Sequence, residues 1–278
     1  MIGELLRRMD ATGSVRIVDL TSTDTTAPAG RPRAIDHQPE VALPLASVIK
    51  IPIAVTLARL VDRDTVDPSA PMRLVPDRRS VGTTGISAMS DPVTLSLRDA
   101  AYLALTISDN AAADAICDAL GGPEVVSAEM ATLGVPITMT ESLRVMYDRS
   151  RDDPERAADG ASTGSAADCV RLLSLLWRDE AASPEGCARI RDLMARQVWH
   201  HRIGSGFPAP DVVVAGKTGT MARWRHEIGV VSYPDGQAYA LAVLTEHADP
   251  IAHPGHDRAI GEIARAGVLA IRRGGTLA

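Results

Sequence analysis

The chain has 278 residues, of which 45% are hydrophobic and 23% charged, and its net charge at pH 7 is −6. A chain of this length and composition can bury a sizeable core, either as one large domain or as two interleaved ones. The acidic balance argues against nucleic acid or an anionic membrane as the main partner, and no apolar run is long enough to span a bilayer.

The first part of the chain alternates between short helices and strands. Residues 4–9 predict a short helix, and residues 15–20 alternate apolar and polar side chains as a strand does. Residues 21–33 are rich in Thr, Pro and Gly and predict a loop, after which residues 33–37 can return as a strand. An apolar helix follows over residues 47–60.

The middle of the chain is predicted to be helical, apart from two irregular stretches. Residues 65–92 carry several prolines and glycines without any period, and residues 138–161 are polar and predict a surface loop. Apolar residues at helical spacing predict the other elements, which are helices over residues 97–106, 111–120, 125–133, 165–177 and 184–196.

The last third of the chain changes from helical to strand patterns. Residues 212–215, 228–232 and 239–245 are short apolar runs typical of buried strands. Pro, Asp and Gly at residues 234–236 predict a hairpin turn between the second and third of these strands. Residues 256–272 predict a closing helix.

Strands at both ends of the chain, with helices between them, predict a mixed α/β fold of the α+β type. Because neither end supplies enough strands alone, the two ends must pair in one antiparallel sheet flanked by the terminal helices. We therefore expect an α/β sheet domain made of residues 1–45 and 205–278, with an all-helical lobe inserted as residues 46–204. An active site would lie in the seam between them.

A serine and a lysine stand one helical turn apart where the first long helix begins. Ser47 and Lys50 occupy positions i and i+3, so they share one face of a helix and the amine can reach the hydroxyl. Serine is a good nucleophile only when a base takes its proton, and an amine shielded from water can be that base. The 29 Lys and Arg residues include only two lysines, Lys50 and Lys217, and both stand in motifs.

Two further runs complete a set of three. They are Ser108-Asp109-Asn110 and Lys217-Thr218-Gly219-Thr220. Taken alone, the first could be only a capped helix connector and the second only the start of a strand. All three in this order and at this spacing make coincidence a poor explanation. The set resembles the penicillin-recognising serine hydrolases, and over nearly the whole chain the spacing is most similar to that of the class A β-lactamases.

This resemblance implies how the acylation step would be divided among the motif residues. Ser47 would be the nucleophile, and Lys50 would be its base or the group that orients it. Ser108 would relay a proton toward the leaving nitrogen, and Asn110 would position Lys50 and the substrate amide. The backbone N–H groups of Ser47 and Thr220 would form the oxyanion hole, where the helix N-terminus adds a favourable dipole.

The resemblance also implies how a substrate carboxylate would be bound. Lys217 would lower the pKa of Lys50 and attract the carboxylate, while Thr218 and Thr220 would donate hydrogen bonds to it. Gly219 would let the substrate backbone approach the strand. Some relatives supply an extra arginine near this pocket, and Arg202 is the first candidate here, with an ordinary surface arginine as the alternative.

One part of the class A pattern is missing. Those enzymes hydrolyse the acyl-enzyme with a glutamate in a Glu-x-x-Leu-Asn run between the second and third motifs, and this chain has no such run. Extension from Gly134 without gaps places Arg144 at the glutamate position. We therefore expect acylation of Ser47 with slow turnover, unless a displaced acid or another route supplies the water. The nearby acidic residues lack the expected neighbours, and they are Glu141, Asp148, Asp152, Asp153 and Glu155.

The leading interpretation is a serine enzyme that hydrolyses β-lactams. The missing glutamate and a start without the layout of a signal peptide leave open an esterase or amidase that acts on another small substrate. A third alternative is a protein that is acylated by β-lactams and signals without turning them over. We expect a small-molecule substrate, no cofactor and no membrane or nucleic-acid partner. We expect a cytoplasmic location, or export if a leader has been removed.

The cysteine pattern adds an expectation about metals and disulfides. Cys117, Cys169 and Cys187 are odd in number, and each lies in a helical pattern. We expect them to be free and buried, without a disulfide framework. No Cys and His spacing is typical of a zinc site, so we expect no metal.

Overall fold

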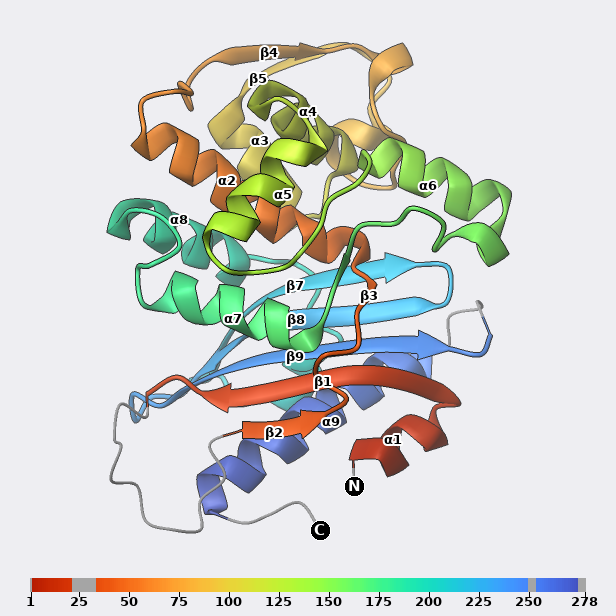
Figure 1. Ribbon diagram of the computed structural model, residues 1–278, viewed down its shortest axis with the longest axis vertical. Coiled ribbons are helices and arrows are strands. Elements are labelled where there is room, and N and C mark those ends of the chain that lie inside the picture. The colour runs from red at the N-terminus through yellow and green to blue at the C-terminus, as the bar shows by residue number, and fades with distance from the viewer. Residues whose placement is uncertain (1, 22–33, 250–253, 275–278) are drawn as a thin grey trace.

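The computed structural model describes residues 2–21, 34–249 and 254–274, so the loop predicted at residues 21–33 lies outside the described residues from residue 22 onward. Its centre is a five-stranded antiparallel sheet in the order β2-β1-β9-β8-β7 (Figure 1). Both ends of the chain contribute strands, which confirms the predicted fold class. The strands are β1 (Ala11–Asp19), β2 (Ala34–His37), β7 (Val213–Met221), β8 (Trp224–Ser232) and β9 (Ala238–His247).

The two faces of the sheet bury alternate side chains in two separate cores. On β8 and β9, Ile228, Val230 and Ala240 belong to the core that the sheet shares with the helical lobe. Val231 and Leu241 belong to the core on the opposite face. Because successive strand residues point to opposite faces, these apolar strands need helices on both sides.

Four helices provide that cover. In Figure 1, α7 and α8 lie between the sheet and the rest of the helical lobe, while α1 and α9 lie on the other face. Contacts of α7 with β1, β8 and β9, of α8 with β7, and of α9 with β1, β8 and β9 agree with this arrangement. The four helices are α1 (Ile2–Arg8), α7 (Ala166–Trp177), α8 (Pro184–Ala195) and α9 (Pro254–Arg273).

Helix α2 (Lys50–Asp62) is the centre of the helical lobe. It is buried over its first two turns and contacts α3 (Leu97–Thr106), α4 (Asn110–Leu120) and α5 (Pro123–Thr132), as well as α8. Its buried start carries a lysine, so the Lys50 amine is held away from water by the packing of the whole lobe.

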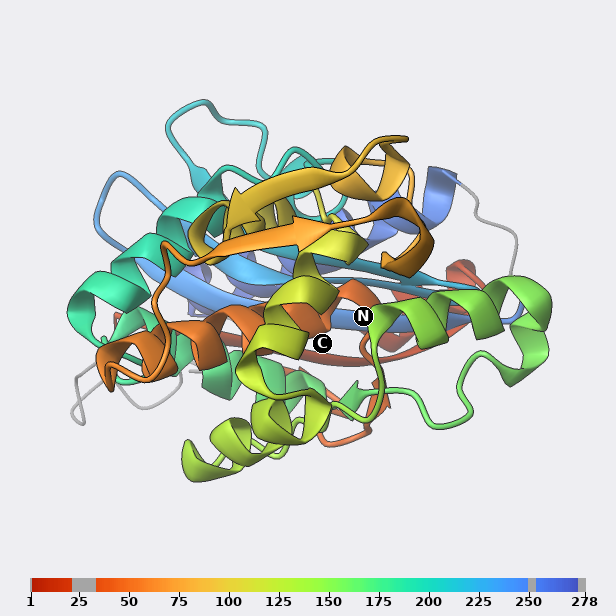
Figure 2. The same cartoon turned by 90° about the horizontal axis from the view of Figure 1, so that it is seen from above.

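Two stretches predicted to be irregular contain regular structure. Residues 138–161 include α6 (Leu143–Asp152), which begins where Ser142 caps it and where the Asp114 carboxylate accepts its first two backbone N–H groups. The local signals for α6, the Ser142 cap and the buried Leu143 and Met146 one turn apart, are short and lie in a polar, arginine-rich stretch, so the sequence was interpreted as a loop. Near residues 65–92, β4 (Pro71–Leu74) pairs with β5 (Val93–Ser96) as an arm above the lobe (Figure 2), so residues 46–204 are not all-helical as predicted.

The remaining elements are short and connect the two layers. β3 (Leu43–Pro44) pairs with β6 (Thr163–Gly164) where the chain passes from the sheet to the lobe and back. The 3₁₀ helices are η1 (Ala46–Ile49), η2 (Pro76–Arg78), η3 (Gly85–Ala88), η4 (Pro154–Arg156) and η5 (Ile203–Gly206).

The structure also bears on the expectations drawn from composition. Cys117, Cys169 and Cys187 are free and buried, as predicted. Within the described ranges, no helix combines the length and apolar character needed to cross a bilayer.

Candidate active site

Ser47 lies in η1, immediately before α2, rather than on the α-helix that the sequence predicts there. The chain enters η1 through Ala46, whose φ of +48° lies in the left-handed region that alanine seldom adopts. Leu45 fixes this entry, because its N–H donates to the Ser162 carbonyl at 2.9 Å and its own carbonyl accepts from Val48 N–H at 3.1 Å. The surrounding structure therefore holds the Ser47 hydroxyl at one position.

The Lys50 amine is the centre of a hydrogen-bond cluster. Its Nζ lies 3.0 Å from Ser47 Oγ, 2.7 Å from Asn110 Oδ1, and 2.7 and 3.0 Å from the carbonyl oxygen and Oγ of Ser108. Four acceptors surround a group that has three N–H bonds when charged. In the neutral amine, a lone pair replaces one of those bonds and can accept the proton of Ser47.

Ser108 joins the two lysines of the chain. Its Oγ lies 3.0 Å from Lys50 Nζ and 2.9 Å from Lys217 Nζ, and the Lys217 amine also donates to the Thr218 carbonyl at 3.0 Å. Ser108 has a φ of +62°, which turns its side chain toward both amines from the connection between α3 and α4. A hydroxyl between two amines can both receive and pass on a proton.

Asp109 holds this connection in place. Its carboxylate caps α4 by accepting the Ala112 N–H at 3.1 Å, and it accepts the Ser87 hydroxyl at 2.7 Å. The backbone N–H of Ile86 also donates to it. The second motif is therefore a capped helix connector, as the plainer interpretation has it, and the cap is what aims Ser108 at the two lysines.

Burial lowers the pKa of both amines. It brings the pKa of Lys50 to about 7, against the opposing charges of Asp114 and Asp109. The pKa of Lys217 is lowered well below its ordinary value by burial and then by the Lys50 charge. Burial, rather than the charge of Lys217, is thus the main reason why Lys50 can be neutral near pH 7. Because the two amines repel each other when both are charged, the state in which both are protonated is disfavoured.

The free edge of β7 presents Thr218 and Thr220. Thr218 N–H donates to Gln197 Oε1 at 2.7 Å, so this N–H points away from β8. Backbone groups two residues apart along a strand point to the same side, so the Thr220 N–H also faces the free edge of the sheet. It is available there as one donor of the expected oxyanion hole.

The missing side chain of Gly219 leaves space for η1 to pack against β7. A Cβ at this position would lie 2.8 Å from the Leu45 carbonyl oxygen and 3.0 Å from Val48 Cγ2. We expected the missing side chain to admit a substrate backbone, whereas the structure uses the space to bring η1 against β7. Glycine at this position therefore sets the separation between Ser47 and the strand edge.

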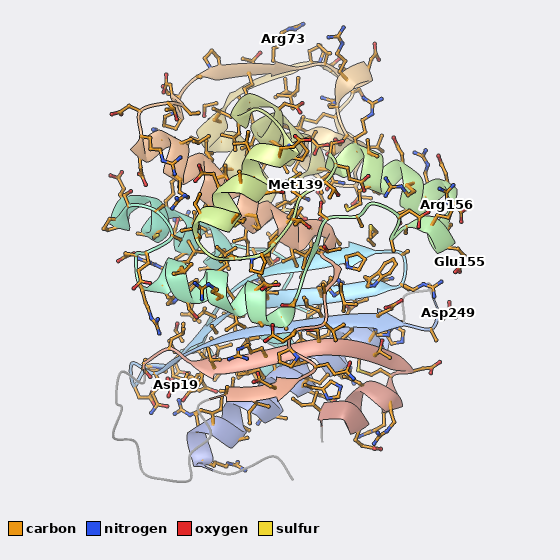
Figure 3. All side chains as sticks on the ribbon, viewed as in Figure 1. Asp19, Arg73, Met139, Glu155, Arg156 and Asp249 are labelled. Atoms are coloured by element: carbon orange, nitrogen blue, oxygen red, sulfur yellow. The ribbon has the colours of Figure 1, made fainter. Side chains whose placement is uncertain are left out.

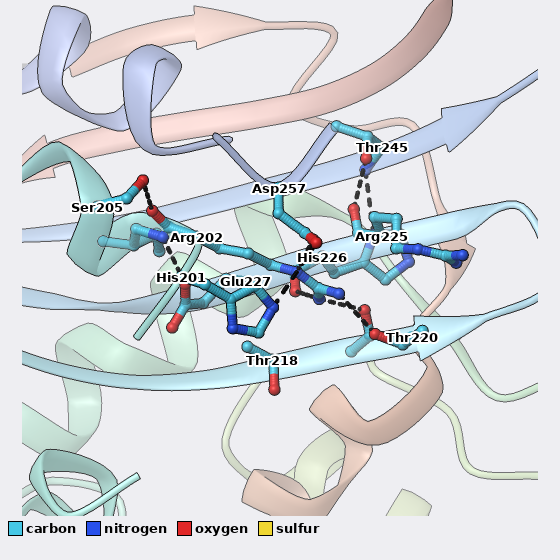
Figure 4. A network of polar contacts seen from close by, with 12 residues as sticks. His201, Arg202, Ser205, Thr218, Thr220, Arg225, His226, Glu227, Thr245 and Asp257 are labelled. Carbon is cyan, nitrogen blue, oxygen red and sulfur yellow. Dashed lines mark hydrogen bonds and ion pairs between the residues drawn. The ribbon is translucent and has the colours of Figure 1, made fainter. Parts of the chain in front are cut away.

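Arg202 is a buried scaffold for the strand edge rather than a surface arginine. It is 4% exposed, and its guanidinium donates to Thr220 Oγ1 at 2.6 Å and to the Gly219 carbonyl at 2.8 Å (Figure 4). The Asp257 carboxylate accepts from its Nε at 2.6 Å. Arg202 lines the cleft and orients the Thr220 hydroxyl, which lines the cleft beside it.

The buried polar residues that support β7 were not predicted from the sequence. Gln197 Nε2 donates to Glu227 Oε1 at 2.9 Å, and burial raises the pKa of Glu227 to about 7. His226 accepts the Thr245 N–H at Nδ1 and thus donates from Nε2 to the Pro44 carbonyl, 2.8 Å away (Figure 4 shows His226, Glu227 and Thr245). None of these residues lies in a recognisable motif; the strand register brings His226, Glu227 and Thr245 together, and Gln197 reaches them from the connection between α8 and η5.

The site opens into a cleft of about 350 Å³ between the lobe and the edge of β7. Ser47, Ser108, Thr218 and Thr220 line it together with aromatic side chains that the sequence analysis did not single out. Among the described residues that line the cleft there is no carboxylate. The full lining is Ser47, Gly82, Thr83, Thr84, Ile107, Ser108, Asn110, Tyr147, Trp199, His201, Arg202, Thr218 and Thr220.

The acidic residues considered for the deacylation step are engaged elsewhere. Glu141 pairs with Arg149, and Glu155 pairs with Arg223 at 2.6 Å. Arg144, the residue at the expected glutamate position, is exposed and lines a different cavity. Asp148 and Asp152 pair with Arg151, and Asp153 caps η4. The residue of α6 that does face the cleft is Tyr147.

Comparison with known proteins identifies relatives of this arrangement over almost the whole chain. The model of the beta-lactamase enzyme family matches residues 2–271. The beta-lactamase regulatory protein BlaB of Streptomyces cacaoi is 29% identical over 293 residues, with 91% of each chain covered. A beta-lactamase of Mycobacterium tuberculosis strain H37Rv is 28% identical over 256 residues, which cover 88% of this chain and 76% of that protein.

Solved structures share the fold. A beta-lactamase from Sphaerobacter thermophilus superimposes with a TM-score of 0.82 at 24% identity and covers 98% of this chain and 96% of its own. A mutant of PBP-A, solved as its acyl-enzyme complex with penicillin G, has a TM-score of 0.81 at 23% identity over 98% of this chain and 95% of its own. At these identities, the superpositions establish a common architecture.

Proposed function

Because the chain belongs to the beta-lactamase enzyme family, we propose that it is a serine hydrolase in which Ser47 attacks the ring amide of a β-lactam. The single observation that carries the proposal is the cluster in which Ser108 Oγ lies 3.0 Å from Lys50 Nζ and 2.9 Å from Lys217 Nζ, with Ser47 Oγ 3.0 Å from Lys50. It supplies a nucleophile, a base with a pKa of about 7 and a proton path in one place.

Acylation proceeds by transfer of one proton around this cluster. Neutral Lys50 takes the proton of the Ser47 hydroxyl while Oγ bonds to the ring carbonyl carbon. The carbonyl oxygen becomes an oxyanion between the N–H groups of Ser47 and Thr220. The ring C–N bond then breaks, and the Ser108 hydroxyl gives its proton to the leaving nitrogen while the proton on Lys50 replaces it. The product is an ester of Ser47.

A substrate carboxylate would bind at the edge of β7. Thr218 and Thr220 line the cleft at that edge, the Lys217 amine is buried next to them on the same strand, and Arg202 donates to the Thr220 hydroxyl. An anion beside Lys217 favours the charged form of this amine. Because the two amines repel each other, charging Lys217 also favours the neutral form of Lys50, so substrate binding would prepare the base.

Hydrolysis of the Ser47 ester needs a water molecule that is activated by a base. The cleft lining supplies no carboxylate from the described residues, and Tyr147 occupies the part of α6 that faces the cleft. A tyrosine hydroxyl is a far weaker base than a carboxylate at neutral pH. We therefore propose that acylation is efficient and that deacylation limits the turnover of β-lactams.

A chromogenic cephalosporin tests this proposal by counting turnovers. We expect a burst of colour equal to about one molecule of product for each enzyme molecule, followed by a slow steady rate. Rapid turnover without a burst would show that a base activates the water after all. Absence of both burst and turnover would remove β-lactams as substrates and leave the esterase or amidase alternative.

A further inference from the structure

The guanidinium of Arg202 lies at the end of the cleft where a substrate carboxylate would bind, but the chain itself uses most of its N–H bonds. Its Nε donates to Asp257 and its Nη2 to Thr220 Oγ1, both at 2.6 Å. Its Nη1 donates to the carbonyl oxygens of Gly219 and His226 at 2.8 and 2.6 Å. A guanidinium has five N–H bonds, so four of them are occupied and Arg202 has little left for a substrate.

The Lys217 amine is also largely engaged within the chain. It is fully buried, and it donates to Ser108 Oγ at 2.9 Å and to the Thr218 carbonyl at 3.0 Å. A charged amine has three N–H bonds, so one remains for a ligand. The two strongest cations at this end of the cleft therefore leave a substrate carboxylate short of donors.

His201 supplies a donor that the chain does not use. It precedes Arg202 and lines the cleft together with Thr218. Within the described ranges, the one hydrogen-bond or ion-pair contact of its ring joins Nε2 to Asp257 Oδ2 at 3.7 Å, which is too long for a hydrogen bond (Figure 4). Trp199 packs edge-on against the imidazole, with the ring centroids 6.2 Å apart. Packing thus holds the ring in place while its nitrogen atoms stay available to a ligand.

Its place in the cleft sets His201 apart from other exposed groups that carry charge. Figure 3 shows Arg73 and Arg156 at the outer edge of the molecule, where both are exposed to solvent. His200, the residue before His201, is exposed too and does not line the cleft. Only His201 of these four faces the space that a substrate would occupy.

We propose that His201 is a specificity-determining residue, which donates a hydrogen bond to the acidic group of the substrate in place of Arg202. Arg202 then acts on the substrate through Thr220, whose hydroxyl it orients. The inference rests on the proposed function, because it concerns the substrate of the same cleft.

The charge of the ring would respond to the substrate. Burial lowers the pKa of His201, and the positive charge of Arg202 lowers it further, against the opposing charge of Asp257. The ring is therefore mostly neutral at pH 7, and a carboxylate beside it would favour the charged form. The other titratable or charged groups around this end of the cleft, from its own segment, α6, β7 and β8, are His200, Tyr147, Lys217, Arg225 and Glu227.

Acylation of the intact chain by penicillin G and by its methyl ester tests the proposal, because only the first compound has a free carboxylate. Intact mass spectrometry after timed mixing gives the acylation rate of each, and the ratio of acid to ester is the readout. We expect the ratio to rise as pH falls from about 8 to about 5, because the ring becomes charged while the carboxylate stays ionised. The need for neutral Lys50 is common to both compounds and to every variant.

His201→Phe keeps a ring against Trp199 and removes the donor. It should lower the ratio by about tenfold near pH 6 and flatten its pH profile, because a hydrogen bond to a charged group is lost. His201→Gln keeps a donor that cannot titrate, so it should restore part of the ratio without the pH dependence. His200→Phe is the matched control and should keep both the ratio and its profile. Because both compounds are compared on the same sample, a misfolded fraction does not alter the ratio.

Two kinds of failure can be told apart. A ratio and pH profile that are the same in His201→Phe as in the unmodified chain, or that change equally in His200→Phe, would overturn the proposal and leave the reaction at Ser47 in place. No acylation of the unmodified chain by either compound would instead overturn the proposed function, and this inference with it.

Discussion

The pH dependence of acylation follows directly from the environment of Lys50. Burial lowers the pKa of this amine from 10.5 to about 7, so about half of the molecules hold the neutral base at pH 7. An amine at its ordinary pKa would be neutral in fewer than about one molecule in a thousand. Burial thus makes the base about a thousandfold more available, equivalent to about 4 kcal/mol.

We predict that the acylation rate rises about tenfold for each pH unit below 7 and levels off above it, because only neutral Lys50 can take the proton of Ser47. Lys50→Arg keeps the positive charge but cannot lose its proton in this pH range. Lys50→Gln removes the charge and the titratable group together. Each should slow acylation by about 10²- to 10⁴-fold and abolish the pH step.

Stopped-flow measurement of the acylation rate with a chromogenic cephalosporin would check this prediction. The pH would be varied from about 5 to about 9, which is about two units on each side of the expected pKa of Lys50. The two variants form a matched pair, because they differ in charge and share the loss of the base. Thermal unfolding of each variant controls for damage to the lobe. A rate in the unmodified chain that does not change with pH, or a Lys50→Gln rate within about threefold of it, would refute the role of Lys50.

Four further predictions follow from the contacts around the cleft. Ser108→Ala should slow acylation by about 10²-fold or more with little loss of stability, which rapid mixing and thermal unfolding would separate. Gly219→Ala should lower thermal stability and acylation together, because its Cβ would meet the Leu45 carbonyl oxygen at 2.8 Å. Burial raises the pKa of Glu227 from 4.5 to about 7, so stability should fall as pH rises through that window by up to about 3 kcal/mol, and urea unfolding of Glu227→Gln should show a flatter profile. Tyr147→Glu places a carboxylate in the cleft lining and should speed deacylation, which is measured as the steady rate after the burst. An unchanged steady rate would mean that the missing carboxylate at residue 147 is not what limits deacylation.

The chemistry of the site could be predicted from the sequence because each motif keeps its reactive residues within a few positions of one another. Ser47 and Lys50 share one turn, and the Asp109 cap that aims Ser108 is the adjacent residue. Short-range geometry of this kind is fixed by the local backbone. The prediction that strands from both chain ends pair was equally well founded, since neither end could bury its apolar faces alone.

Features that depend on distant contacts could not be read from the sequence. Helix α6 begins where the carboxylate of Asp114 binds its first N–H groups, and nothing in its own polar residues shows this. Gln197, in the connection between α8 and η5, contacts Glu227 of β8 and Thr218 of β7, and only the folded chain brings these three together. The approach of η1 to Gly219 is likewise a tertiary contact that the sequence does not show. Without it, the missing side chain could only be interpreted as space for a substrate.

The proposed function requires that Ser47 forms an ester with a β-lactam and that this ester persists. Intact mass spectrometry after brief mixing with penicillin G tests it most directly, followed by peptide mapping of the modified chain. We predict one added penicillin per chain, located on Ser47, absent from Ser47→Ala and lost only slowly. An adduct at another residue, or an unmodified chain with unconsumed penicillin, would show that Ser47 is not the nucleophile for β-lactams.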